Sequence, residues 1–220
     1  MKKIILSAVA VLGIVAANNA NAQHFSDPKF GIKAGVNVAN ITNAREVVDD
    51  SKAMTTFNAG FVAALPLSQT FEIRTGLDVQ SKGFRSKETG GTARLNPIYL
   101  ELPVNLAFQL PINERVKAYV GAGPYAAVGL FGKYQNLGTG YDAKNIEWGN
   151  DAPGDSGDEG TLKRFDAGAN IIGGLDFGKF GIHAQYGFGL ANSAPDNSSY
   201  WGEDKKYQNR VFGLSGVFYF

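Results

Sequence analysis

The chain has 220 residues, no cysteine, 28 glycines and a formal net charge of +1. This length suits one domain, and the absence of cysteine excludes a fold held together by disulfides. A near-neutral chain gives no argument for binding nucleic acid or for polybasic docking on a membrane.

The first 22 residues have the pattern of a secretory signal peptide. Lys2 and Lys3 supply a positive start, an apolar run follows from Ile4 to Val15, and Ala20-Asn21-Ala22 fits the small-x-small cleavage pattern. The run is shorter than the ~20 residues of a membrane-spanning helix. We therefore expect a signal peptide over 1–22, a short N-terminal extension over 23–29, and a mature chain that is exported.

Beyond the extension, apolar residues recur at every second position up to Phe220. This period of two predicts β-strands, and no helical period of comparable strength competes with it. Most of the segments run 9–11 residues, which is the length that a tilted strand needs to cross a bilayer. The eight predicted strands are 30–38, 57–65, 71–79, 98–108, 116–128, 167–177, 180–190 and 212–220.

The connections between these strands alternate between short and long. The short ones are 66–70, 111–114 and 178–179, and the long ones are 39–56, 80–97, 129–166 and 191–210. Short periplasmic turns and long outer loops are typical of bacterial outer-membrane barrels. The sequence therefore predicts an all-β fold, an eight-stranded antiparallel up-and-down transmembrane β-barrel over residues 30–220, with both ends on the periplasmic side.

Two prolines lie inside predicted strands. Pro103 and Pro124 cannot donate a backbone hydrogen bond, and proline in a sheet is confined to edges and bulges. We expect a bulge or a locally broken ladder at each.

The residue types on the two faces of the strands indicate which face meets lipid. One face is large and apolar, and the other mixes glycine with charges of both signs. A cation turned toward lipid at the midplane would cost ~2–4 kcal/mol, so the charged face must line the lumen. Charges in so narrow a lumen must pair with one another. The expected polar network of the lumen is Lys33, Glu72, Arg74, Asp78, Tyr99, Glu101, Lys117, Tyr119, Tyr125 and His183.

The last strand also has the features of a targeting signal. It ends on Phe220, at the tip of an alternating segment. Such an ending is typical of substrates of the barrel insertion machinery, which we expect to recognise this strand and to deliver the protein to the outer membrane. Outer-membrane lipid and lipopolysaccharide are then expected partners.

Several of these segments resemble one known family. Phe30-Gly31-Ile32-Lys33-Ala34-Gly35-Val36-Asn37, Ile98-Tyr99-Leu100-Glu101-Leu102-Pro103-Val104, Val120-Gly121-Ala122-Gly123-Pro124-Tyr125 and Asp166-Ala167-Gly168 look like strands of the Bacteroidetes-type outer-membrane β-barrel proteins, the "porin family" that includes PorT. The resemblance covers the mature chain. It implies the barrel and its compartment, and it brings no catalytic residues.

The long loops hold the candidate contacts for partners. The second is basic, with Lys82, Arg85, Lys87 and Arg94, and these cations suit lipopolysaccharide phosphates or the acidic third loop. A surface loop kept soluble by its charge is the favoured interpretation. Exposed aromatic residues on loops can anchor a partner, and here they are Trp148, Tyr200 and Trp201; Tyr207 is expected in the interfacial aromatic girdle. The acidic stretch 151–159 could gather oxygens around Ca²⁺, but it lacks the EF-hand spacing, and a solvated loop is the favoured interpretation.

Catalytic, metal and cofactor motifs do not stand out. His183 and Ser215 share a parity on neighbouring strands, yet a hydrogen-bonded histidine in a polar network is the favoured interpretation. We expect no enzyme, no cofactor and no metal. The leading hypothesis is a small barrel with a filled lumen and a structural or surface-interaction role through its outer loops. Narrow porin-like transport of small solutes and an accessory role in a PorT-like secretion machinery stay open, with the protein partner unknown.

Overall fold

A computed structural model describes residues 27–41, 52–88, 91–136, 143–151, 160–196 and 207–220. Within these ranges no helix is long and apolar enough to cross a membrane. The strands are β1 (Lys29–Ile41), β2 (Met54–Pro66), β3 (Phe71–Ser81), β4 (Phe84–Glu88), β5 (Gly91–Pro111), β6 (Val116–Asn136), β7 (Lys144–Asn145), β8 (Glu147–Trp148), β9 (Thr161–Leu162), β10 (Phe165–Phe177), β11 (Phe180–Gly189) and β12 (Asn209–Tyr219).

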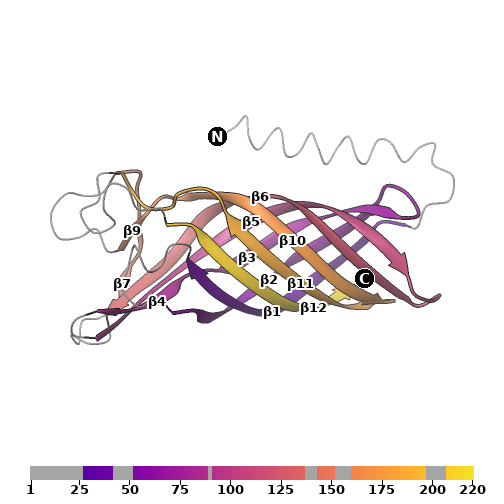
Figure 1. The fold of residues 1–220 in the computed structure, drawn as a ribbon, viewed down its shortest axis with the longest axis horizontal. Coiled ribbons are helices and arrows are strands. Elements are labelled where there is room, and N and C mark those ends of the chain that lie inside the picture. The colour runs from indigo at the N-terminus through magenta and orange to yellow at the C-terminus, as the bar shows by residue number, and fades with distance from the viewer. Residues whose placement is uncertain (1–26, 42–51, 89–90, 137–142, 152–159, 197–206) are drawn as a thin grey trace.

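Eight of these strands close into an antiparallel barrel (Figure 1). Around the barrel their order is β5-β3-β2-β1-β12-β11-β10-β6, and β6 returns to pair with β5. The first and last strands pair directly, from Gly31 opposite Tyr219 to Ile41 opposite Asn209. Closure gives every barrel strand two neighbours, which is what a lipid environment demands of β-structure. The predicted fold class is confirmed, and each of the eight predicted strands corresponds to one barrel strand.

The two ends of the barrel differ in the length of their connections. The turns after β2, β5 and β10 are short and lie at one end, where Phe220 N–H also donates to Phe30 O at 3.0 Å. Gly178 takes a positive φ of 67° in the tightest of them, the β10–β11 turn, where a left-handed residue is needed. The described parts of the long connections, which include β4, β7 and β9, lie at the other end (Figure 1). This is the alternation that the sequence predicts.

Side chains alternate between lipid and lumen along each strand. In β12, Phe212, Leu214 and Phe218 are exposed, while Ser215 and Tyr219 are buried. Phenylalanines are exposed at the turn end of the barrel, where pairs such as Phe71 with Phe108 stack edge to face. The exposed apolar face of the barrel is therefore its lipid-facing surface, as the alternation predicts.

The narrow lumen explains part of the glycine content. A Cβ at Gly168 in β10 would run into the carbonyl oxygen of Phe188 and the ring of Tyr125. Glycine at this position lets a neighbouring backbone and an aromatic ring approach closely.

Both intrastrand prolines interrupt their ladders. The β3–β5 pairing lacks the pairs that would contain Pro103 and Leu102, and the β5–β6 pairing lacks those that would contain Pro124 and Gly123. Pairing resumes in the same register on either side, so the ladder is locally broken, as predicted, without a bulge. The register shift of this sheet lies instead between Ile98 and Tyr99, beside Pro97.

The outer end holds more β-structure than the sequence indicates. β5 and β6 each run 21 residues and extend into stretches predicted as loops. β4 pairs with the extension of β5, and β7 pairs with that of β6 (Figure 1). Parts of the predicted outer loops are therefore strands, because backbone pairing and apolar packing above the barrel continue β5 and β6.

The midpoint of β10 offers a test of the lipid-facing surface. Ile171 is 51% exposed there, and we expect Ile171→Arg to lower the free energy of unfolding by about 2–4 kcal/mol, because it places a cation near the bilayer midplane. Ile112 is 58% exposed at the β5–β6 turn, and Ile112→Arg should cost only about 0–1 kcal/mol near the interface. Urea titration of protein refolded into lipid vesicles measures both. Equal costs for the two variants would contradict the lipid-facing assignment.

Candidate functional site: the barrel interior

The turn end of the lumen is bridged by one arginine. Arg74 of β3 donates through Nε to Glu72 and through Nη2 to Asp176 of β10, and its Nη1 lies 3.1 Å from the Tyr219 hydroxyl. Its guanidinium carbon lies 3.3 Å from the ring centroid of Tyr119. Since β3 and β10 are not neighbours in the barrel, these contacts, here called the Arg74 cluster, cross the lumen.

A second cation bridges the lumen toward the outer end. Lys82, just after β3, lies 2.8 Å from Glu101 Oε2 and 3.0 Å from Asp166 Oδ2. Its ammonium faces the ring of Tyr125 at 4.4 Å and that of Tyr99 at 5.2 Å. We call these five residues the Lys82 cluster. A single buried ammonium thus pairs with two carboxylates, one from β5 and one from β10.

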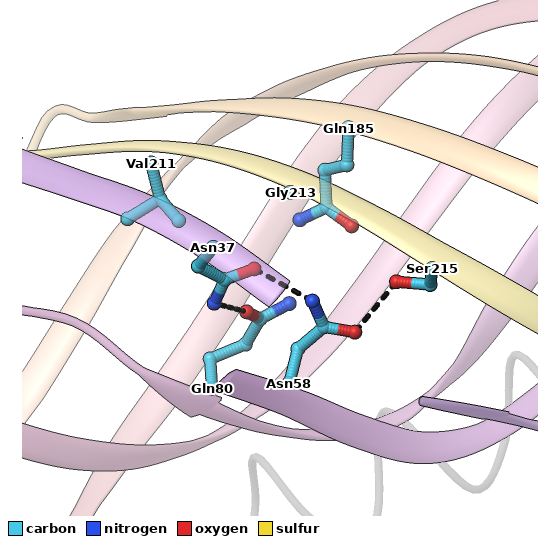
Figure 2. Close-up of a pocket in the computed structure, with 7 residues that line it drawn as sticks. All are labelled: Asn37, Asn58, Gln80, Gln185, Val211, Gly213 and Ser215. Atoms are coloured by element: carbon cyan, nitrogen blue, oxygen red, sulfur yellow. Dashed lines mark hydrogen bonds between the residues drawn. The ribbon is translucent and has the colours of Figure 1, made fainter. Parts of the chain in front are cut away.

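Amide and hydroxyl groups fill the space between the two clusters. Asn37 donates to Gln80 Oε1 at 2.8 Å, Asn58 donates to Asn37 Oδ1 at 2.6 Å, and Ser215 donates to Asn58 Oδ1 at 2.6 Å (Figure 2). Beside this chain, Lys33 Nζ lies 2.8 Å from Asp78 Oδ2. The interior of the barrel between the two clusters is therefore lined by hydrogen-bonded and ion-paired polar side chains.

The outer end is closed by apolar side chains. They come from strand extensions and outer connections, pack into one cluster, and include Leu162 and Tyr207 with no exposed surface. We call this cluster the apolar cap. Its members are Ile41, Phe84, Ala93, Leu95, Tyr134, Ile146, Leu162, Ala194 and Tyr207, with Trp148 packed against it.

The interior carries more carboxylates than cations. Among the described residues, the buried carboxylates are Glu72, Asp78, Glu101, Asp166 and Asp176, and the buried cations are Lys33, Arg74 and Lys82. Half-buried Lys117 acts electrostatically on Glu72 and adds positive charge near the turn end. Each bridging cation is thus held by two anions, which fixes its position more firmly than one pair would.

The structure brings the sequence-predicted lumen residues together with one difference in burial. Nine of them are buried, and Lys117 is half-buried at the turn end. Sequence reasoning left Lys82, Asp166, Asp176 and Tyr219 out of the network. Alternation along the strands places Asp176 and Tyr219 on the face that lines the lumen. Lys82 follows the end of a strand, where alternation no longer indicates the direction of a side chain.

His183 and Ser215 lie opposite each other in the β11–β12 ladder. His183 Nδ1 lies 2.7 Å from the Tyr119 hydroxyl, and Ser215 Oγ donates to Asn58. Serine and histidine therefore bind other partners, and their geometry is not that of a nucleophile with its base.

The expected loop contacts need correction. Lys82 is buried in the lumen, so it cannot meet a partner at the surface. Arg85 and Arg94 are half-buried, and Trp148 turns inward, with its ring centroid 5.6 Å from that of Tyr99. The Lys87 side chain, Tyr200 and Trp201 lie outside what the structure describes.

The expected position of Tyr207 also needs correction. It does not lie in an interfacial girdle, because it is wholly buried in the apolar cap. Its ring centroid lies 5.8 Å from that of Phe84. This burial raises the pKa of its hydroxyl well above the ordinary value. The acidic stretch considered for Ca²⁺ lies mostly at 152–159, outside the described residues, and in the described part no three acidic or histidine side chains gather as metal ligands.

A closed eight-stranded barrel with an apolar outer face and a polar interior defines a class, the small outer-membrane β-barrels. A model of the family described as "Outer membrane protein beta-barrel domain" matches residues 18–194, and the chain belongs to this family. It is an outer-membrane protein. No curated protein matches the chain.

Two of the solved structures that are similar to this chain are those of Ail and Neisserial surface protein A. Ail, the attachment invasion locus protein of Yersinia pestis, is 14% identical, with a TM-score of 0.43, over 89% of this chain and 100% of that chain. Neisserial surface protein A is 10% identical, with a TM-score of 0.47, over 89% and 100%.

The Lys82 cluster can be tested against a surface pair of the same kind. Lys82→Met leaves Glu101 and Asp166 buried without their cation, and we expect it to lower the free energy of unfolding by about 3–5 kcal/mol. Lys163 pairs with Asp196 at 2.7 Å in an exposed position, and Lys163→Met should cost about 0–1 kcal/mol. Chemical denaturation in lipid vesicles measures both variants.

A third variant separates lost charge pairing from lost packing. Lys82→Met combined with Glu101→Gln and Asp166→Asn removes the unpaired charges and should recover most of the loss. A triple variant as unstable as Lys82→Met alone would show that packing, rather than charge, decides the stability of this cluster.

Proposed function

We propose that this protein is a non-conducting outer-membrane barrel that acts through its outer surface, by contact with molecules outside the cell. The observation that carries the proposal is the closed lumen. The Arg74 cluster, the Lys82 cluster and the apolar cap lie in series along the barrel, and each draws side chains from several strands.

Porin-like transport would need a water path wide enough for a solute. Such a path would run past Glu72, Arg74, Glu101 and Lys117. Of these, Arg74 holds a cross-lumen contact to Asp176, and Glu101 holds one to Gln185. Opening it would break buried ion pairs, and each broken pair leaves an uncompensated charge that costs about 3–5 kcal/mol. The structure therefore supports an interaction role more than transport.

The outer end presents groups suited to anionic lipid. Lys133, Lys144 and Arg164 are exposed on β6, on β7 and just before β10, near the lipid-exposed Phe131 and Phe165. Cations above an apolar belt suit the phosphates of lipopolysaccharide, and we propose this lipid as a partner. Recognition of the β12 strand, which ends at Phe220, by the insertion machinery belongs to the same proposal.

A Bacteroidetes-type, PorT-like secretion role is the second candidate for the protein partner. It rests on the sequence resemblance of the strands, and it predicts a partner in the secretion apparatus rather than outside the cell. The two candidates differ in which end of the barrel is contacted.

Planar bilayers test the closed lumen. Because charged layers and an apolar cap lie in series, we expect the purified protein to give no stable, discrete conductance at neutral pH, with a conducting porin in the same bilayers as the control. Reproducible single-channel steps that disappear on heat denaturation would overturn the non-conducting assignment.

Site-specific photo-cross-linking tests which end is contacted. Asn145 on β7 and Asn113 in the β5–β6 turn are both exposed, at opposite ends of the barrel. We expect a benzoylphenylalanine probe at Asn145 in intact cells to cross-link to lipopolysaccharide or an extracellular protein, and a probe at Asn113 to give no such product. Adducts formed only at Asn113, with periplasmic secretion proteins, would favour the PorT-like role instead.

A further inference from the structure

Three small cavities lie inside the barrel between the Arg74 and Lys82 clusters. The first lies along the amide chain of Asn37, Asn58 and Ser215 (Figure 2). The second is lined by Lys33, Arg74, Asp78, Asn105 and His183, among others, and the third by Lys82, Glu101, Tyr125 and Asn170, among others. The volume open to the centre of a water molecule is about 10 Å³ in the first, about 20 Å³ in the second and about 10 Å³ in the third. Each therefore has room for about one water molecule.

The cavities are linked through shared side chains. Gln185 of β11 lines all three, and Gln80 and Val211 line both the first and the third. Figure 2 shows the Gln185 amide pointing toward the same space as Asn37 and Asn58. One amide side chain thus lies at the junction of the three spaces.

Buried polar atoms without a protein partner lie on the cavity walls. Within the described part of the chain, Asn105 Oδ1 and His183 Nε2 lack a hydrogen bond beside the second cavity, and Asn170 Oδ1 lacks one beside the third. Leaving such a group unsatisfied costs about 1–3 kcal/mol. Water can donate to both amide oxygens, and it can accept from or donate to the histidine nitrogen in either tautomer.

We propose that the lumen binds a short file of about three water molecules, one in each cavity, with Gln185 at its junction. The file hydrates the inner sides of the Arg74 and Lys82 clusters and ends below the apolar cap. These waters are structural ligands of the barrel, and they complete the hydrogen bonds that the side chains leave open. The inference is independent of any partner at the outer surface.

Water is favoured over a bound cation by the groups that line the spaces. Lys33 and Arg74 line the second cavity, and Lys82 lines the third, so a metal ion there would meet a protein cation. The first cavity is lined by neutral groups alone, which favours a neutral ligand.

A high-resolution crystal structure, paired with water–protein cross-relaxation in NMR spectra, tests the proposal on the full barrel. We expect one ordered water in each cavity of the wild type. Gln185→Met keeps the length of the side chain and removes its polar end, and it should lose at least the waters that contact Gln185. Gln109→Met makes the same change at a buried lumen residue that lines none of the three cavities, and it should retain all three waters.

Asn105→Leu provides a second variant if Gln185→Met does not fold. It removes the unpaired oxygen beside the second cavity, and it should lose the water there while the other two remain. Dry cavities in the wild type, or waters unaffected by both substitutions, would overturn the proposal. An anomalous peak in any cavity after the crystals are soaked in thallium salts would identify the ligand as a monovalent cation rather than water. That result would also overturn the proposal.

Discussion

The rest of the structure depends on the lack of water in the lipid core. A strand there must pair its backbone on both sides, and closing the sheet is the way to leave no edge. With eight strands, closure leaves an interior only wide enough for side chains. Charges within the lumen are then buried, and each must find an opposite charge or a hydrogen-bond partner. The Arg74 and Lys82 clusters are the direct result.

Two kinds of packing occupy the lumen, and each occupies a different part of the barrel's length. Within the membrane the lumen is filled by ion pairs and amides, whose orientation is fixed by hydrogen bonds. Beyond it, β5 and β6 continue, β4 and β7 join them, and side chains from these extensions and from outer connections form the apolar cap. Water surrounds this outer part, so the hydrophobic effect can again stabilise a core there. Within the membrane, moving apolar side chains from lipid into the lumen would gain little, because lipid is itself apolar.

The prediction of the site from sequence succeeded where strand parity applied. Lys33, Glu72, Arg74, Asp78 and Glu101 lie inside regular strands, and alternation together with the cost of placing charge in lipid assigned them to the lumen. It failed at Lys82, which follows β3, and at Trp148 and Tyr207, which lie at or beyond the ends of barrel strands. At such positions the period of two ends, and the direction of a side chain depends on backbone turns and on packing partners that are distant in the sequence.

The sequence by itself determined the number of barrel strands, their order along the chain, which end carries the short turns, and which face meets lipid. These features follow from local periodicity and from the cost of placing charge in lipid. Only the tertiary structure decided which charges pair, that one lysine joins Glu101 to Asp166, and that Ile146, Leu162 and Tyr207 from described parts of the outer connections pack into the apolar cap. Lys82 and Asp166 are 84 positions apart in the sequence, and Asn170 and Glu101 are 69 positions apart. Their geometry is set by the stagger of a closed barrel, which no local pattern encodes.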